Sequence, residues 1–304
     1  MLLCFGEAKP DFAQVGFGAK ATGGGNKNVV NVTTVEDLKK YAESAEPATI
    51  QISKTLSGGA AGIEIHVKSD KTILGVGSSG ALHGIGLHLE GVKNIVIRNL
   101  KMTMSTVTKT IVDDRQHTVI DVNGGDVVTV MDSTNIWIDH NEFYNVDPAK
   151  NTNKDLYDGL VDITHKCDEI TLSWNYFHDH WKCNLIGASD TDNYDRKVTL
   201  HHNHWKNIDS RVPSVRFGHA HVYNNLYEHI FGSGVHTRVG ACVVVEDNYF
   251  DNVKDPLFDE TDGPGKFEAK DNTFVNVKGQ QNVTEKCTYT LPYKYTLESV
   301  STVK

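Results

Sequence analysis

Three stretches of the chain hold more polar and ionisable side chains than a purely structural segment needs. They span residues 124–141, 158–182 and 210–218. Acids stand out in the first two stretches, and two arginines stand close together in the third. Acids and bases at this density are typical of a site that binds or transforms a charged ligand.

The acids Asp126, Asp158 and Asp162 form the first candidate group. Asp158 and Asp162 are four residues apart at the start of an apolar run, and Asp126 precedes them by about one long repeat of the pattern described below. Carboxylates stacked one strand spacing apart would repel one another and raise each other's pKa. A hard cation removes that repulsion, and Ca²⁺ suits a partly open, all-carboxylate site. The alternative is three separate, solvated acids.

The bases Lys182, Arg211 and Arg216 follow one or two repeats later, with Pro213 between the two arginines. A guanidinium group holds a carboxylate in a fixed fork. Acids and bases on adjacent repeats therefore predict a cleft for an anionic ligand that needs both a metal ion and guanidinium groups. The alternative is that both arginines pair with surface acids, where each pair contributes little to stability.

The chain has 15 histidines, and two groups of them stand close in sequence: His178 with His180, and His201 with His202 and His204. Zinc binding is one interpretation, but the fixed ligand set of a structural zinc site is missing. We expect polar turn or packing residues instead, with His178 and His202 near the cleft.

A repeated pattern that begins near residue 70 must position these side chains. Short β-branched runs alternate for a few residues and then end on asparagine, as in NIWIDHN at 135–141. The closing residues are Asn99, Asn141, Asn175, Asn203, Asn225, Asn248 and Asn272. The last three intervals are 22, 23 and 24 residues, and the longer earlier ones leave room for loops. A repeat of roughly twenty residues, one strand with its turns, is the signature of a β-solenoid.

Stacked coils would align these asparagines in a ladder of side-chain hydrogen bonds. The alternative is a β-sandwich with coincidental asparagine turns. Residues 34–43 predict a short helix, with Thr34 as N-cap and acids in the first turn. We place this helix in an N-terminal cap over about residues 1–48. No linker, charge block or low-complexity tract divides the chain, so we expect a single domain over residues 1–304.

The charge and hydropathy patterns exclude several classes of partner. The chain carries a net charge of −9, which argues against nucleic acid because phosphate binding needs clustered basic residues. No apolar run is long enough to cross a membrane. The apolar residues 1–5 are too short for a signal peptide and lack a basic start.

The five cysteines, at positions 4, 167, 183, 242 and 287, include no CxxC pair, so zinc or thioredoxin chemistry is not indicated. One candidate bridge joins Cys167 and Cys183, which lie on adjacent predicted coils. The alternative is that both are buried as small apolar residues. Glycosylation sequons at Asn31 and Asn282 are compatible with secretion.

Four motifs together carry a resemblance to a known family. They are NIWIDHN at 135–141, DGLVDIT at 158–164, FHDHWK at 177–182 and RVPSVRFG at 211–218. The chain resembles the pectate lyases of polysaccharide lyase family 1, from Gly16 to about residue 275. The resemblance implies a right-handed parallel β-helix and a calcium-dependent enzyme. Such an enzyme cleaves α-1,4-linked polygalacturonate by β-elimination to unsaturated oligogalacturonates.

The resemblance also implies roles for single residues. Those matched are the calcium ligands Asp126, Asp158 and Asp162, the catalytic base Arg211, and the substrate-carboxylate binders Lys182 and Arg216. We add His178 to the substrate binders because we expect it near the cleft. Two positions depart from the pattern: some members have an Asp where Gly124 stands, and some have a Lys where Thr164 stands. At these two positions the chain lacks a calcium ligand and a substrate contact that those members have.

The implied chemistry reconciles an acidic protein with an acidic polymer, because Ca²⁺ can bridge the aspartates and a galacturonate carboxylate. Withdrawal of charge from that carboxylate acidifies the C5 proton, which Arg211 would remove. An arginine side chain has an ordinary pKa above about 12, so an alkaline optimum is expected.

Three other functions are open. A calcium-independent pectin lyase would replace most of the acids, a β-helix hydrolase would need a paired acid and base around water, and an inactive pectin-binding protein could share the scaffold. For the lyase we expect secretion to the extracellular space, a monomer, and no nucleic-acid or membrane partner.

Overall fold

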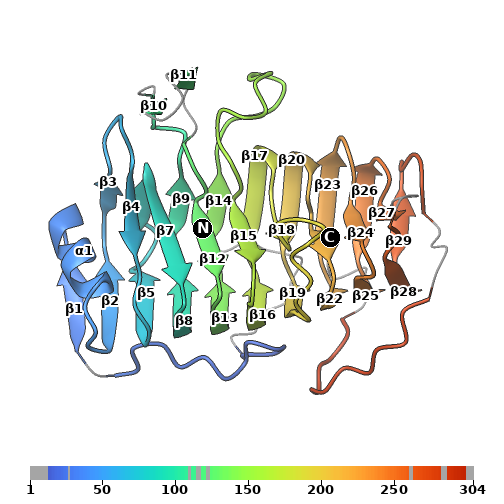
Figure 1. Cartoon of the computed structure of the whole chain (residues 1–304), viewed down its shortest axis with the longest axis horizontal. Coiled ribbons are helices and arrows are strands. Elements are labelled where there is room, and N and C mark those ends of the chain that lie inside the picture. The colour runs from blue at the N-terminus through green and yellow to red at the C-terminus, as the bar shows by residue number, and fades with distance from the viewer. Residues whose placement is uncertain are drawn as a thin grey trace.

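The computed structural model describes residues 13–26, 28–108, 111–113, 118–120, 124–259, 263–281 and 286–298. In these ranges the chain winds through three parallel sheets, A, B and C, passing from one to the next in each coil. Figure 1 shows the coils stacked along the long axis of the molecule. The predicted all-β parallel solenoid is confirmed.

Ten strands form sheet A. They are β1 (Val29–Val32), β2 (Ala48–Ile52), β5 (Lys71–Gly75), β8 (Lys93–Arg98), β13 (Thr134–Asp139), β16 (Asp168–Ser173), β19 (Lys197–His201), β22 (His219–Tyr223), β25 (Cys242–Glu246) and β28 (Lys266–Lys270). Nine strands form sheet B. They are β3 (Thr55–Ser57), β6 (Ala81–His83), β9 (Lys101–Thr103), β14 (Glu142–Tyr144), β17 (Tyr176–Lys182), β20 (His204–Ser210), β23 (Leu226–Ile230), β26 (Tyr249–Val253) and β29 (Thr273–Val275).

Eight strands form sheet C, which will carry the site. They are β4 (Ile63–His66), β7 (Ile85–Glu90), β12 (Val128–Met131), β15 (Val161–Thr164), β18 (Leu185–Ile186), β21 (Ser214–Arg216), β24 (Val235–Arg238) and β27 (Leu257–Asp259). A small antiparallel hairpin, β10 (Ile111–Asp113) with β11 (Thr118–Ile120), stands outside the coils. The loops from sheet B to sheet C are the long ones near the hairpin, so insertions gather beside sheet C (Figure 1).

The turn from sheet A to sheet B is fixed by the asparagine ladder. The buried amide of each asparagine donates to the side-chain oxygen of the next, over 2.9–3.2 Å. The ladder residues are Asn141, Asn175, Asn203, Asn225, Asn248 and Asn272.

Including Asn99 in that ladder was wrong. Arg98 pairs with Asp139 in register, so Leu100 rather than Asn99 stands beside Asn141, and its N–H donates to the Asn141 side chain. Asn99 occupies the preceding turn position, with a left-handed φ of +57° that asparagine tolerates.

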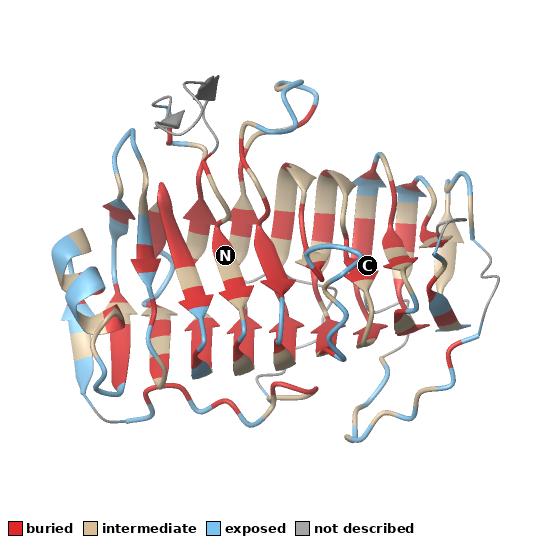
Figure 2. Ribbon diagram, in the orientation of Figure 1, coloured by how far each residue is buried: buried red, intermediate tan, exposed pale blue. Residues whose placement is uncertain are grey.

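Inside the solenoid, side chains of the same type stack on one another from coil to coil. Under sheet B, six rings stack with centroids 4.3–5.5 Å apart. They belong to Phe143, Phe177, Trp205, Tyr227, Phe250 and Phe274. Figure 2 shows the buried residues running through the strands of every coil while the long loops are largely exposed. Packing inside therefore makes the strands a rigid support for outward-facing side chains.

Helix α1 (Val35–Ala42) covers one end of the stack, as predicted. The hydroxyl of Thr34 accepts the N–H of Asp37 over 3.1 Å and so caps the helix. Leu38 and Ala42 are buried against the first coils. Among the described residues, no helix has the length and apolar character that crossing a bilayer requires.

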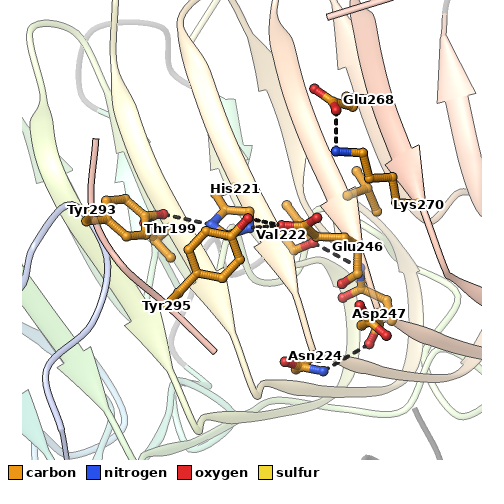
Figure 3. A network of polar contacts seen from close by, with 12 residues as sticks. Thr199, His221, Val222, Asn224, Glu246, Asp247, Glu268, Lys270, Tyr293 and Tyr295 are labelled. Carbon is orange, nitrogen blue, oxygen red and sulfur yellow. Dashed lines mark hydrogen bonds and ion pairs between the residues drawn. The ribbon is translucent and has the colours of Figure 1, made fainter. Parts of the chain in front are cut away.

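Two terminal segments lie across the outer face of sheet A. The N–H groups of Phe17 and Gly18 donate to the hydroxyls of Thr199 and Thr171. On the same face the C-terminal segment, residues 286–298, places Tyr293 and Tyr295 over β19, β22 and β25 (Figure 3). A polar network therefore covers the outer surface of sheet A.

The predicted Cys167–Cys183 bridge is wrong. Both thiols are free and buried. Cys167 lies in the turn from sheet C to sheet A and Cys183 in the turn from sheet B to sheet C, so they occupy different corners of one coil. Among the described residues, a disulfide joins Cys242 of β25 to Cys287 and ties the C-terminal segment to sheet A. Of the two sequons, Asn31 is exposed on β1, while Asn282 lies outside the described residues.

Candidate active site

Strands β12 and β15 place two of the predicted acids on neighbouring coils of sheet C. Thr129 pairs in register with Asp162, and its hydroxyl donates to Asp126 Oδ2 over 2.8 Å. The Gly159 N–H donates to Asp126 Oδ1 over 2.7 Å, and the Leu185 N–H donates to Asp162 Oδ1 over 2.9 Å. Each carboxylate is therefore fixed by a group from an adjacent coil.

The positive charge near Asp126 and Asp162 is too weak to balance their burial and mutual repulsion. Burial raises the pKa of Asp126, and the charge of Asp158 raises it further. Burial raises the pKa of Asp162 well above its usual range, and Asp126 adds to the effect. Arg211 opposes both shifts, but its Nη1 stands 3.9 Å from Asp162 Oδ2. The site therefore favours a further positive charge.

Asp158 completes the acid group from a more exposed position. Its side chain is 44% exposed, and Lys182 Nζ stands 3.3 Å from its Oδ1. The backbone carbonyl of Asp158 accepts a hydrogen bond from the ring of His180. Burial lowers the pKa of His180 to about 4, so the imidazole is neutral at ordinary pH and acts as a fixed support.

The turn from β20 to β21 places Arg211 beside the acids. Arg211 has a left-handed φ of +61° and precedes a cis Val212–Pro213 peptide bond. Asn184, on the neighbouring coil, donates its N–H to the Arg211 carbonyl over 2.6 Å and accepts the Ser214 N–H over 3.0 Å. These two bonds hold the backbone on both sides of Pro213 and aim Arg211 toward Asp162.

Arg216 lies at the end of β21, further along sheet C. Ile163 pairs with Ile186, which pairs with Val215, so Arg216 stands two strands from Thr164 at the same height. Two strand spacings are about 10 Å. Arg216 Nε donates to Asp190 Oδ1 over 2.8 Å, and its Nη1 donates to the Gly187 carbonyl.

His178 lies apart from this group, on the outer face of sheet B. Its ring stacks on Tyr144 and Tyr176, with centroids 5.1 and 4.3 Å away. Its Nδ1 is 2.8 Å from Asp179, and its Nε2 is 3.5 Å from Glu142. Burial lowers the pKa of His178, but these two acids outweigh it and raise the pKa overall. Its role toward substrate stays a prediction.

The acid group fits a hard cation by the chemistry of its donors. Asp126, Asp158 and Asp162 offer carboxylate oxygens, the ligand type that Ca²⁺ prefers, and burial and mutual repulsion raise the pKa of Asp126 and Asp162. As the side chains stand, no three His, Cys, Asp or Glu residues of the described chain are grouped as a metal cage. Asp158 points to Lys182 instead.

Several residues of the site were not predicted. Gly159 is required because a Cβ there would lie 2.3 Å from Asp162 Oδ1. Gly124, a position that departs from the family pattern, faces the ring of Tyr157, which a Cβ would meet at 2.7 Å. Asp155 and Asp190 pair with Lys182 and Arg216, two of the three predicted substrate binders. The motifs contain Gly159, but no spacing rule identifies the two loop aspartates.

Comparison with known proteins agrees with this architecture. The pectate lyase family matches residues 7–304. A pectate trisaccharide-lyase of Bacillus licheniformis is 39% identical over 97% of this chain and 84% of its own. A probable pectate lyase B of Aspergillus terreus is 37% identical over 90% of this chain and 79% of its own. A pectate lyase of a Bacillus species, solved with trigalacturonate, is 32% identical, with a TM-score of 0.81 over 97% of this chain and 96% of that one.

The fold, the acid group and the relatives together define the class of protein. It is a polysaccharide lyase built on a parallel β-helix. Within that class, the chain belongs to the pectate lyase family.

Proposed function

We propose that the protein is a secreted, calcium-dependent pectate lyase that cleaves α-1,4-linked polygalacturonate to unsaturated oligogalacturonates. The observation that supports this most is the acid pair beside Arg211, in which Asp126 is half-buried, Asp162 is buried, and both have raised pKa values. Asp126, Asp158 and Asp162 would hold Ca²⁺. When bound, the ion would attach the polymer's carboxylate to the acidic protein and withdraw charge from it.

The chain's own residues would perform the rest of the reaction. Lys182, at the end of β17 in sheet B, and Arg216, at the end of β21 in sheet C, would bind substrate carboxylates. Arg211 would take the proton from C5. The electron pair of that C–H bond forms the C4–C5 double bond while the C4–O bond breaks, and the leaving oxygen takes up a proton. His180 and Asn184 would keep the Asp158 and Arg211 backbones in place.

Two features support the proposed location and state. The Cys242–Cys287 disulfide suits an oxidising, extracellular compartment. Helix α1 covers one end of the stack, which hinders end-to-end assembly and suits a monomer.

The direct test is the ultraviolet absorbance of unsaturated product from polygalacturonate, first with calcium and then with a chelator. We expect product only with calcium, while circular dichroism shows that the chelated solenoid stays folded. Fully methyl-esterified pectin is the control. Efficient cleavage of that substrate by chelated protein would instead favour a pectin lyase.

A further inference from the structure

Both cations assigned to substrate carboxylates already pair with aspartates of neighbouring loops. Lys182 Nζ stands 3.1 Å from Asp155 Oδ1, and Arg216 Nε stands 2.8 Å from Asp190 Oδ1. The aspartate side chains are 68% and 63% exposed, whereas those of Lys182 and Arg216 are only 18% and 12% exposed. Each cation thus lies in the wall of the site, and each aspartate approaches it from the solvent side.

The loop that carries Asp190 is built to hold it there. Asp192 Oδ2 accepts the N–H groups of Ala188 and His165, over 2.8 and 2.9 Å. The same carboxylate pairs with the guanidinium of Arg196, which is fully buried. Arg196 also donates to the carbonyl of Arg216, so one buried group ties the loop to the strand end that bears the cation.

The loop that carries Asp155 is ordered by its own turns. Asn151 Oδ1 accepts the Asn153 N–H, and Asn153 Oδ1 accepts the Asp155 N–H, each over 3.1 Å. The Trp181 indole donates to the Asn151 carbonyl over 2.7 Å. Trp181 precedes Lys182 in β17, so this loop too is tied to the strand that bears its cation.

We propose that Asp155 and Asp190 are internal carboxylates that occupy the sites on Lys182 and Arg216 and must be displaced by the carboxylates of the polymer. This inference rests on the proposed function, in which the two cations bind galacturonate. An aspartate side chain presents the same carboxylate group as a uronic acid, and the Nε edge of Arg216 can bind only one of them in a fork. The two aspartates would therefore lower the affinity of the site.

The expected size of the effect on substrate affinity follows from the exposure of the two aspartate–cation ion pairs. Exposed ion pairs of this kind change a binding constant by about two- to fivefold. Displacement also makes a prediction about salt. The wild-type protein exchanges one ion pair for another on binding, whereas a variant without the aspartate gains an ion pair. Polymer binding by that variant should therefore weaken more steeply as salt is added.

The test compares Asp190→Asn with Asp195→Asn. Asp195 lies on the same loop, is 65% exposed and pairs with His219 and Lys197, so its substitution removes the same charge at a similar exposure. We expect Asp190→Asn to lower the KM for polygalacturonate about two- to fivefold and to steepen its salt dependence. Asp195→Asn should leave both as in the wild type. An unchanged or higher KM in Asp190→Asn would overturn the proposal, the higher value showing that Asp190 positions Arg216.

Asp155→Asn repeats the test at Lys182, and the double variant should combine the effects to roughly tenfold because the two pairs involve different loops. Calorimetric titration with polygalacturonate and calcium, with Arg211→Ala in every protein compared, measures affinity without turnover. Failure of the proposed function would appear as a wild type that makes no unsaturated product. Failure of this inference would appear as an active wild type whose aspartate variants bind the polymer no more tightly.

Discussion

Two regions on the outside of the solenoid contain buried or half-buried carboxylates with opposite electrostatics. On sheet A, burial works against the charge of Glu246, but hydrogen bonds from His221 and Tyr295 outweigh it and lower the pKa of Glu246 overall. On sheet C, burial and mutual repulsion raise the pKa of Asp126 and Asp162, and nothing nearby outweighs them. Hydrogen bonds within the protein therefore stabilise the charge of Glu246, whereas the charges of Asp126 and Asp162 are not balanced.

The sheet A network shows what a structural arrangement looks like (Figure 3). Burial lowers the pKa of His221, so its ring is neutral. Its Nε2–H then donates to Glu246, and its Nδ1 accepts from the Tyr293 hydroxyl. Every group finds a partner inside the protein. Unbalanced acids on the same scaffold, held in place by backbone N–H groups, indicate instead a site prepared for something the chain does not supply.

The largest effect should come from removing Arg211, a cation that opposes the pKa shifts of both acids. We expect Arg211→Ala and Arg211→Lys to reduce formation of unsaturated product by about a thousandfold, because neither replacement puts a guanidine at C5. The free energy of unfolding should change by no more than about 1 kcal/mol, since Arg211 is partly exposed and its Nη1 is 3.9 Å from Asp162 Oδ2. Activity near wild type in either variant would remove Arg211 from the role of base.

Paired substitutions then test the comparison itself. Asp162→Asn keeps the oxygen that accepts the Leu185 N–H but removes the uncompensated charge. With chelator present, we expect it to leave the protein as stable or more stable, by up to about 1 kcal/mol, while product formation falls about a hundredfold. Glu246→Gln should do the reverse: about 1–3 kcal/mol less stable, with product formation unchanged.

Thermal unfolding and the absorbance assay, on the same preparations, measure the stability and the product formation of both variants. The contrast fails if Asp162→Asn destabilises as much as Glu246→Gln, because both regions would then be structural in the same sense.

The repeat could be predicted from sequence because it comes from local patterns, but the exact register could not. Alternation and closing asparagines identify the strand and turn of each coil, whereas the one-residue difference at Asn99 depends on which residues pair across coils. Likewise, motifs identified Asp162 and Arg211, and the spacing of the acids added Asp126; the fold brings the three together. Partners supplied by loops of variable length, such as Asp190, follow only from three-dimensional proximity.

A third prediction uses pH to separate the two regions. An acid whose pKa is raised on folding contributes stability below its unfolded pKa and loses it as pH rises through the folded value. Chelated wild-type protein should therefore lose stability relative to Asp162→Asn as pH rises above about 4. Glu246 has the opposite sign: its contribution is present above about pH 4.5 and disappears as pH falls through its lowered pKa.

Melting temperatures of the wild type, Asp162→Asn and Glu246→Gln across this range measure both slopes. Parallel curves for all three proteins would show that neither carboxylate changes its pKa on folding.

The smallest effect should come from Tyr295→Phe, which removes a single hydroxyl from the sheet A network. Tyr295 donates to Glu246 Oε1 over 2.6 Å, and His221 donates to the same carboxylate over 3.0 Å, so Glu246 keeps one partner when the hydroxyl is lost. We expect a loss of about 0.5–1.5 kcal/mol, the usual contribution of one hydrogen bond. The ring still packs on His221 and Tyr223, so the C-terminal segment should stay in place. Denaturant unfolding measures the loss, and a decrease as large as that of Glu246→Gln would mean that the hydroxyl, rather than the imidazole, keeps the carboxylate charged.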